Sequence, residues 1–365
     1  MLSQPEAIRY LLGLGLLQAG DVVQDTVTVA NVSRRHLNWR VTTQNGPGYL
    51  LKQGVGGERA AALEREAAIY RLLNAVPGFA RRYVPQLHLH DAENGVLILE
   101  WIAGSQNLRE YHLRRGHFPV SLARIMAEAL GRLHRHGPGG PEYEARSANV
   151  PWIFSAHRPT LRFLQDCSGA NLALIELTQE FPDFCEEIDA LRAAWHDDAL
   201  IHGDLKWDNC VVSGNAASVR TTRLRIVDWE LARTGDPCWD VGSAFHDYLG
   251  FWLQSIPITG TMPPERFLEL ARFPLEKMHP ALRAFWSTYA RAMDLDAEAT
   301  ERWLIRSVRY AAARLLQTAF EQMQGAAQLT GNIVCFLQLS FNILKRPREA
   351  AVHLLGLPPP HVRLA

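Results

Sequence analysis

Residues 200–212 read LIHGDLKWDNCVV, and residues 223–242 read RLRIVDWELARTGDPCWDVG. The first segment brings Asp204, Lys206 and Asn209 together, and the second places Asp228 at the end of an apolar run. Such a set suits phosphoryl transfer from a nucleotide. One carboxylate accepts the proton of the attacking hydroxyl, a cation steadies the moving phosphate, and an amide and a second carboxylate hold Mg²⁺.

The spacing within these segments is that of a kinase catalytic loop. Protein kinases carry H-R-D-L-x-x-x-N and then D-F-G, whereas this chain carries H-G-D-L-K-W-D-N and then D-W-E. The substitutions resemble the aminoglycoside phosphotransferase and choline kinase families, whose patterns run approximately HGDxxxxN and then DWE…GDPxxDL. Asp236, Pro237 and Asp240 extend the resemblance, which covers roughly residues 25–250. It implies a protein-kinase-like fold and a kinase that uses ATP and Mg²⁺ to phosphorylate an alcohol group.

Apolar periodicity also favours such a fold. Alternation over residues 25–43 predicts two strands, and three more are expected at 49–52, 86–90 and 96–101. A helix over residues 58–73 follows the third strand, which is the order of a kinase N-lobe, and the chain after Gly104 is mainly helical.

We therefore predict an α+β, bilobal protein-kinase-like fold with a five-stranded antiparallel N-lobe and a mainly helical C-lobe. Residues 1–103 are expected to form the N-lobe, with an N-terminal helix, the nucleotide-binding sheet and its helix. Residues 104–365 are expected to carry the catalytic loop, the metal site and the helices that bind the acceptor. The nucleotide is expected in the cleft between the lobes.

Composition limits the partners and the compartment. The 365 residues carry a formal net charge of +0, so no overall field recruits nucleic acid or an anionic membrane. The apolar stretch Leu11–Leu17 is too short to span a bilayer, and Ser3 and Glu6 have capping-box spacing, so we expect a helix there and not a signal peptide. The five scattered cysteines suggest no disulfide framework and a cytoplasmic protein. The sequence leaves the oligomeric state open.

Three of the residues in the two segments have clear expected roles. Asp204 is the expected general base, because it follows a short apolar run and the flexible His202-Gly203 pair. Asn209 and Asp228 are the expected Mg²⁺ ligands, since both offer the hard oxygen atoms that this ion prefers.

Lysine is scarce, at four residues among 38 basic ones, and two of the four, Lys52 and Lys206, fall where nucleotide chemistry needs a cation. Lys52 ends the third predicted strand, where kinases keep the Lys that meets the α- and β-phosphates and is held by a helix Glu. Glu66 best resembles that glutamate, because Glu64 points elsewhere on the helical wheel. Lys206 is expected to stabilise charge on the γ-phosphate; the alternative is that it only covers Trp207.

The nucleotide-binding loop has no glycine motif. Residues 31–38 contain no Gly, so phosphate contacts are expected from Ser33, nearby backbone N–H groups, or Arg34 and Arg35. Glu100, Trp101 and Ile102 are expected to form the hinge that meets the adenine. The resemblance implies that Asp240 supports the loop at residues 202–204 through its backbone N–H groups.

The acceptor is left open by two opposing patterns. Acidic clusters at residues 186–189, 197–198 and 294–298 suit a cationic acceptor, whereas Arg302, Arg306 and Arg309 form a stripe that suits an anionic one. The resulting expectation is an ATP-dependent phosphotransferase acting on a hydroxyl of a small molecule such as an aminoglycoside, amino alcohol or sugar. A kinase of a peptide or protein hydroxyl and a catalytically silent nucleotide-binding scaffold are the alternatives.

Overall fold

A computed structural model of the chain describes residues 2–24, 26–33, 37–44, 46–54, 56–76, 78–137, 150–214, 222–257 and 269–357. Arg34 and Arg35 lie outside these residues. The chain divides into two compact units, the first made of Met1–Tyr111 with Asp208–Ala232, and the second of His112–Trp207 with Arg233–Ala365. No helix within the described ranges is long and apolar enough to cross a membrane.

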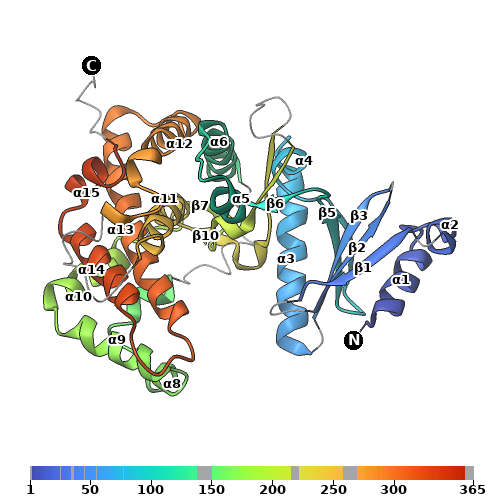
Figure 1. The fold of residues 1–365 in the computed structure, drawn as a ribbon, viewed down its shortest axis with the longest axis horizontal. Helices are drawn as coiled ribbons and strands as arrows, with labels where there is room; N and C mark the ends of the chain where they lie inside the picture. The colour runs from blue at the N-terminus through green and yellow to red at the C-terminus, as the bar shows by residue number, and fades with distance from the viewer. Residues whose placement is uncertain are drawn as a thin grey trace. The chain divides into compact units, whose positions relative to one another are not determined.

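The first unit is built on a five-stranded antiparallel sheet in the order β1-β2-β3-β5-β4 (Figure 1). Its strands are β1 Val27–Asn31, β2 Leu37–Thr43, β3 Gly48–Gln53, β4 Leu87–Asp91 and β5 Val96–Trp101. The helices of the unit are α1 Gln4–Gly13, α2 Ala19–Val23, α3 Gly57–Ala75 and α4 Ala80–Tyr83, with the 3₁₀ turn η3 Trp229–Leu231. The five predicted antiparallel strands and the helix after the third of them along the chain are confirmed.

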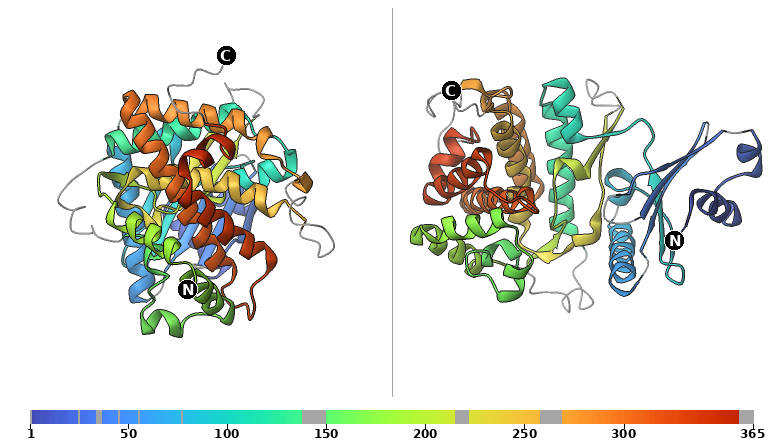
Figure 2. Two further views of the ribbon diagram at one scale, coloured as in Figure 1. Left: turned by 90° about the vertical axis from the view of Figure 1, so that its left-hand side faces the viewer. Right: turned by 60° about the horizontal axis from the view of Figure 1, so that its bottom comes forward.

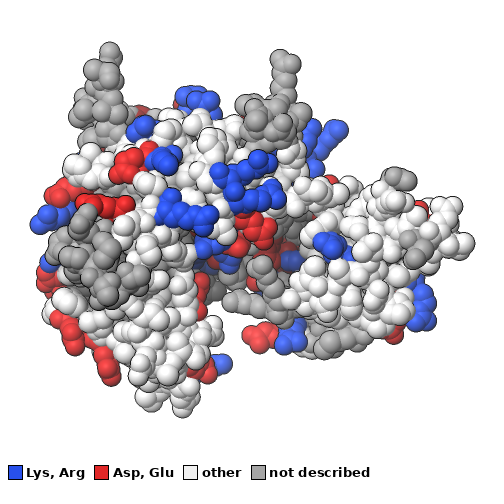
Figure 3. Space-filling view, viewed as in Figure 1, with Lys and Arg blue, Asp and Glu red and all other residues white. Residues whose placement is uncertain are grey.

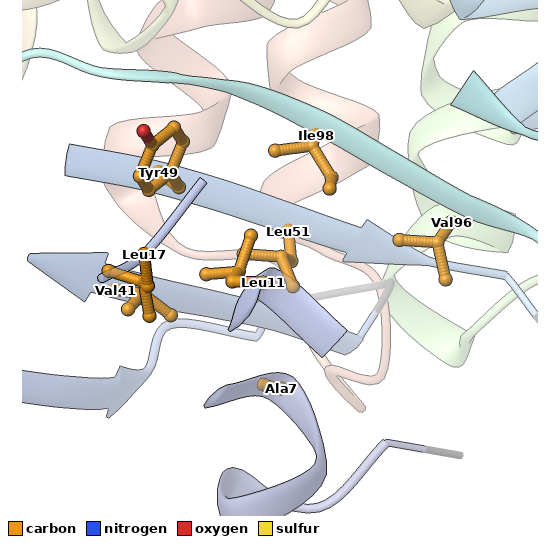
Figure 4. Close-up of a cluster of buried hydrophobic side chains, with 8 residues drawn as sticks. All are labelled: Ala7, Leu11, Leu17, Val41, Tyr49, Leu51, Val96 and Ile98. Carbon is orange, nitrogen blue, oxygen red and sulfur yellow. The ribbon is translucent and has the colours of Figure 1, made fainter. Parts of the chain in front are cut away.

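Helices α1 and α3 cover opposite faces of this sheet (Figure 1). On the α1 side, Ala7 and Leu11 pack against strand residues such as Leu51 in a buried apolar cluster (Figure 4). Helix α1 begins as predicted, because the Ser3 N–H donates to the Glu6 carboxylate at 2.6 Å. Strand alternation then sends Lys52, the neighbour of Leu51, to the opposite face, where α3 lies.

The segment 208–232 adds a second, smaller antiparallel sheet to the first unit, in the order β6-β8-β9. Its strands are β6 Gln106–Asn107, β8 Cys210–Ser213 and β9 Arg223–Ile226. The first unit thus includes residues beyond the predicted N-lobe of residues 1–103, among them both predicted metal ligands. The lobe boundary itself stays a prediction.

The second unit is mainly helical (Figure 2). It has one two-stranded sheet, β7 Ala199–Ile201 with β10 Arg233–Gly235. Its helices are α6 Val120–His136, η1 Trp152–Ser155, α8 Leu161–Gln165, α9 Gly169–Gln179, α10 Pro182–Ala193, α11 Pro237–Gln254, η5 Leu275–Lys277, α12 His279–Ala292, α13 Ala297–Gln322, α14 Gly331–Lys345 and α15 Pro347–His353. Helix α5 Leu108–Arg115 and η2 Trp207–Asn209 each contain a boundary between the units.

Helix α11 is the core of the second unit, and every residue from Pro237 to Leu253 is buried. It approaches α13 closely at Gly242, where a Cβ atom would lie 2.7 Å from the Ser307 carbonyl oxygen and 2.8 Å from Tyr310 Cβ. Only glycine permits that approach. The close contact fixes α13 against the N-terminal end of α11, which carries Asp236 and Asp240.

Candidate functional site

The first unit contains a cavity of about 350 Å³. Six predicted site residues line it: Lys52, Glu100, Trp101, Ile102, Asn209 and Asp228. The rest of the lining is supplied by Val32, Asn38, Leu50, Tyr70, Pro85, Leu99, Ser105, Gln106, Asn107, Glu110, Asp208, Val211 and Val227. All of these residues belong to the first unit. The predicted cleft between the lobes stays a prediction.

Lys52 is the centre of a buried charge cluster in this cavity. Its Nζ lies 2.9 and 3.0 Å from the two carboxylate oxygens of Glu66 and 2.8 Å from Oδ1 of Asp228. Lys52 is 7% exposed and Glu66 1%. Burial alone would lower the pKa of Lys52, but the two carboxylates hold it above its ordinary value, so the ammonium stays charged. The pairing of Lys52 with Glu66 agrees with the sequence expectation, and Glu64 is exposed.

The β8–β9 hairpin brings Asn209 and Asp228 to the same cavity. Cys210 pairs with Ile226, and the Val227 N–H donates to the Asn209 carbonyl at 2.9 Å, so the two residues lie at the same end of the hairpin. Asp228 has φ of +66°, a strained conformation for a residue with a Cβ atom. Strain of this kind is typical of functional positions.

These two side chains fit a magnesium ion. Asn209 offers an amide oxygen and Asp228 a carboxylate, which are the hard oxygen ligands that Mg²⁺ takes from proteins while it keeps several waters. The Asp228 side chain remains 39% exposed although Lys52 occupies its Oδ1. Asn209 and Asp228 are therefore the residues of this chain that could hold the ion.

The predicted hinge lines the cavity, but its side chains have other partners. The Glu100 carboxylate accepts from Arg225 of β9 and from the Gln86 N–H. The Ser105 hydroxyl donates to the Ile102 carbonyl at 2.6 Å. Trp101 lies beneath the guanidinium of Arg40, 5.4 Å from ring centroid to Cζ. The Glu100 carboxylate and the Ile102 carbonyl are thus engaged within the first unit, and the contact of the hinge with a base stays a prediction.

Ser33 forms hydrogen bonds within its own loop. Its Oγ accepts the Asn38 N–H at 2.9 Å, and its own N–H donates to Asn31 Oδ1 at 2.9 Å. Among the described residues of this loop, Val32 and Asn38 line the cavity and Ser33 does not. A direct phosphate contact from Ser33 stays a prediction.

Asp204 belongs to the second unit, in the loop that follows β7. The Lys206 ammonium lies 2.6 Å from its Oδ2, and Nη2 of Arg314 lies 3.2 Å from its Oδ1. Burial would raise the pKa of this carboxyl, but the charges of Arg314 and Lys206 hold it below its usual range. The carboxylate is therefore ionised near neutral pH, as a proton acceptor must be.

Asp240 supports this loop from the first turn of α11, as predicted. Its buried carboxylate accepts the His202 N–H at 2.7 Å and the Gly203 N–H at 3.1 Å. His134 lies 3.2 Å away, with its other ring nitrogen on the Tyr289 hydroxyl. Gly203 has φ of +79°, a conformation that glycine adopts without strain, so the loop turns sharply just before Asp204.

The family is decided by comparison with known proteins. A sequence profile of the phosphotransferase enzyme family matches residues 26–285. The chain belongs to this family. Phosphate transfer is the activity that the description of this family names, and the catalytically silent scaffold stays an alternative.

Solved structures share the fold of this phosphotransferase. A choline/ethanolamine kinase family protein from Mesorhizobium loti is 19% identical, with a TM-score of 0.50 over 93% of each chain. Choline kinase LicA from Streptococcus pneumoniae is 16% identical, with a TM-score of 0.49 over 94% of this chain and 99% of that one. The predicted α+β fold, with its antiparallel sheet and mainly helical remainder, is confirmed.

One curated relative matches over a short segment only. It is acyl-CoA dehydrogenase family member 11 from Gallus gallus, 39% identical over 64 residues. The match covers 18% of the phosphotransferase and 8% of that protein. The chain thus spans a small fraction of the length of this relative.

Two buried charges of the phosphotransferase were not expected from its sequence. Arg314 contacts Asp204, and Asp247 accepts the Trp207 N–H at 2.7 Å. Each lies in an otherwise apolar helical run, and a charge in such a run is buried only when it is paired. That signal could have identified both residues, although it could not have identified their partners.

The packing of Trp207 bears on the alternative reading of Lys206. The indole is buried against His112, Tyr248 and Phe251, with ring centroids 4.5, 4.8 and 5.3 Å away. The Lys206 ammonium lies instead at Asp204. Aromatic neighbours therefore account for the burial of the indole.

Each arginine of the predicted stripe has a carboxylate partner. Arg302 pairs with Glu298, Arg306 lies 3.2 Å from Asp236, and Arg309 lies 2.7 Å from Glu187. Acidic and basic side chains are interspersed on the face shown in Figure 3. The arginine stripe thus offers the phosphotransferase no uncompensated basic surface, and the charge of the acceptor stays open.

Proposed function

We propose that this phosphotransferase moves the γ-phosphate of ATP to a hydroxyl group of a small molecule. The observation that carries the proposal is the buried cluster in which Lys52 bridges Glu66 and Asp228 in a cavity that Asn209 also lines. A protonated lysine can bind the phosphates of a nucleoside triphosphate, and the oxygen atoms of Asn209 and Asp228 can bind its metal ion.

Each part of the cavity has a proposed task. Lys52 binds the α- and β-phosphates, and Glu66 keeps its ammonium oriented. Backbone groups of residues 100–102 meet the adenine. Asn209 and Asp228 would hold Mg²⁺, which when bound neutralises charge on the β- and γ-phosphates.

Asp204 is the proposed proton acceptor. As the acceptor oxygen bonds to the γ-phosphorus and the bond to the leaving diphosphate breaks, the hydroxyl proton passes to the carboxylate. Lys206 is proposed to stabilise charge that develops during this transfer. Its side chain is 37% exposed, so its ammonium can leave Asp204 and turn toward a phosphate.

The acceptor class is proposed from the fold. The structure with the TM-score of 0.50 is described as a choline/ethanolamine kinase family protein, and we infer a small-molecule hydroxyl as acceptor on that basis. Arg302 and Arg309 of the stripe pair with glutamates of the acidic clusters, so the stripe gives the peptide alternative no specific support.

The test is a search for a phosphorylated product. Purified protein is incubated with Mg²⁺-ATP and pooled amino alcohols, sugars and aminoglycosides, and products heavier by one phosphate are sought by mass spectrometry. The Asp204→Asn variant is the control, with an expected loss of about 10²–10⁴-fold and nearly unchanged ATP affinity. If both proteins form equal amounts of product, Asp204 is not the proton acceptor. If only peptides are phosphorylated, the acceptor is a peptide hydroxyl and not a small molecule.

A further inference from the structure

Helix α13 carries a polar stripe that ends at the proposed base. Arg306, Tyr310 and Arg314 recur at intervals of four residues, so they lie along one face of the helix. Arg306 and the Tyr310 hydroxyl contact Oδ2 of Asp236, the N-cap of α11, at 3.2 and 2.9 Å. Arg314 continues the stripe to Asp204. The first two residues tie α13 to α11, and the third reaches the catalytic loop.

Arg314 is held with little freedom. It is 3% exposed, and its Cζ lies 5.5 Å from the centroid of the Trp239 ring. Trp239 in turn donates from Nε1 to the Gly203 carbonyl at 3.1 Å. The Nε of Arg314 is buried with no hydrogen-bond partner among the described residues. A guanidinium is seldom buried in this way unless a carboxylate compensates it, and here that carboxylate is Asp204.

The two cations at Asp204 differ in how firmly they are held. Lys206 is on the same loop as Asp204 and is partly exposed, so it can move with the loop or away from it. Arg314 comes from a long helix, and its planar group is fixed by the Trp239 ring. The lasting constraint on Asp204 Oδ1 is therefore the one from Arg314.

We propose that Arg314 is a positioning residue for Asp204. It fixes Oδ1 and thereby orients the carboxylate that receives the proton of the acceptor hydroxyl. The inference rests on the proposed role of Asp204 as base. It adds that α13 supplies the orientation of that base, which the motif alone does not provide.

The charge of Arg314 has a second effect, on protonation. Arg314, Lys206 and His202 lower the pKa of Asp204. Arg233 also interacts electrostatically with Asp204 and with Asp240. Loss of Arg314 would raise the pKa of Asp204, because a cation that favours the ionised form is removed. The acidic limb of the rate profile would then move to higher pH.

Three variants test the inference. Arg314→Met removes the charge and keeps an apolar stem, whereas Arg314→Lys keeps the charge and removes the planar fork. Arg309→Met is the matched control, because Arg309 is on the same helix but pairs with Glu187. The probe is Mg²⁺-ATP with water as acceptor, with phosphate release followed between about pH 5 and pH 9.

We expect Arg314→Met to lower kcat about 10²-fold with KM for ATP unchanged, and to move the acidic limb upward. Arg314→Lys should keep the limb in place and recover about tenfold of kcat. If Arg314→Met has the same kcat and pH limb as Arg309→Met and differs only in melting temperature, Arg314 merely packs α13 and the inference is wrong.

A measurement without turnover separates this inference from the proposed function. Unfolding equilibrium constants are compared for the wild type, Asp204→Asn, Arg314→Met and the double variant. A contacting pair should give losses that are non-additive by about tenfold or more; additive losses would overturn the inference. If the wild type transfers phosphate to no acceptor, the proposed function is wrong. If the wild type is active and Arg314→Met has the same turnover, only the inference about Arg314 is wrong.

Discussion

Replacement of Asp240 by Asn tests whether its carboxylate holds the catalytic loop. Asp240 is fully buried and accepts the His202 and Gly203 N–H groups, with His134 as a third partner. The Asn side chain has only one acceptor oxygen. That oxygen is expected to replace Oδ2, because Oδ2 contacts both the His202 N–H and His134. The NH₂ group then faces the Gly203 N–H, so two donors oppose each other.

The expected loss follows from these contacts. One charge-assisted hydrogen bond contributes about 1.5–3 kcal/mol, and a buried N–H left without an acceptor costs about 1–3 kcal/mol. Because the loop can relax in part, we expect Asp240→Asn to lower the free energy of unfolding by about 3 kcal/mol. Displacement of the loop should also lower kcat about 10²-fold, since Asp204 directly follows Gly203.

The assay is urea unfolding followed by tryptophan fluorescence, together with steady-state kinetics. Asp183→Asn is the control, because Asp183 forms an exposed ion pair with Lys345 at 2.9 Å and its loss should change the midpoint little. If Asp240→Asn unfolds at the same urea concentration as Asp183→Asn and turns over normally, the buried carboxylate does not hold the loop.

Three further outcomes are expected. Asp228→Ala should abolish the gain in ATP affinity that Mg²⁺ gives the wild type in calorimetry; an equal gain in the variant would exclude Asp228 as a ligand. Lys206→Met should lower kcat and kcat/KM together with KM for ATP unchanged, and a raised KM alone would indicate a ground-state clamp. Burial lowers the pKa of His112 to about 4, below the unfolded value of about 6.5, so the folded state resists protonation. The free energy of unfolding should therefore fall by about 2 kcal/mol between pH 7 and pH 5, and by less in His112→Asn. Melting curves recorded over this pH range test the difference, and equal losses in both proteins would contradict it.

Local patterns were sufficient to predict much of the sheet, and the resemblance added the Lys52–Glu66 pair. Strand alternation places Leu51 and Lys52 on opposite faces, and the helical wheel separates Glu66 from Glu64. The pairing of Lys52 with a helix glutamate was itself implied by the resemblance to kinases. The role of Asp240 was implied by the resemblance. The predicted contacts of the sheet and of Lys52 join strands and a helix that follow one another closely in the chain.

Contacts between distant segments were not predictable in this way. Arg314 meets a residue 110 positions earlier in the chain, and nothing in the run around it identifies that partner. The arginine stripe on α13 was open to interpretation as an anion site because two of its partners, Asp236 and Glu187, lie outside that helix. The bond from the Asn38 N–H to the Ser33 hydroxyl was likewise not evident from the sequence.

One boundary between the compact units falls between Trp207 and Asp208, inside HGDLKWDN. The cavity that holds Lys52 therefore cannot be completed from residues 1–111 alone. During synthesis, Glu66 is available early, but Asn209 and Asp228 emerge only after the whole of residues 112–207. A fragment ending at Tyr111 would keep the lysine and its glutamate without a ligand for the metal ion. Any exchange of the nucleotide-binding part between relatives would have to carry two separate stretches of the gene.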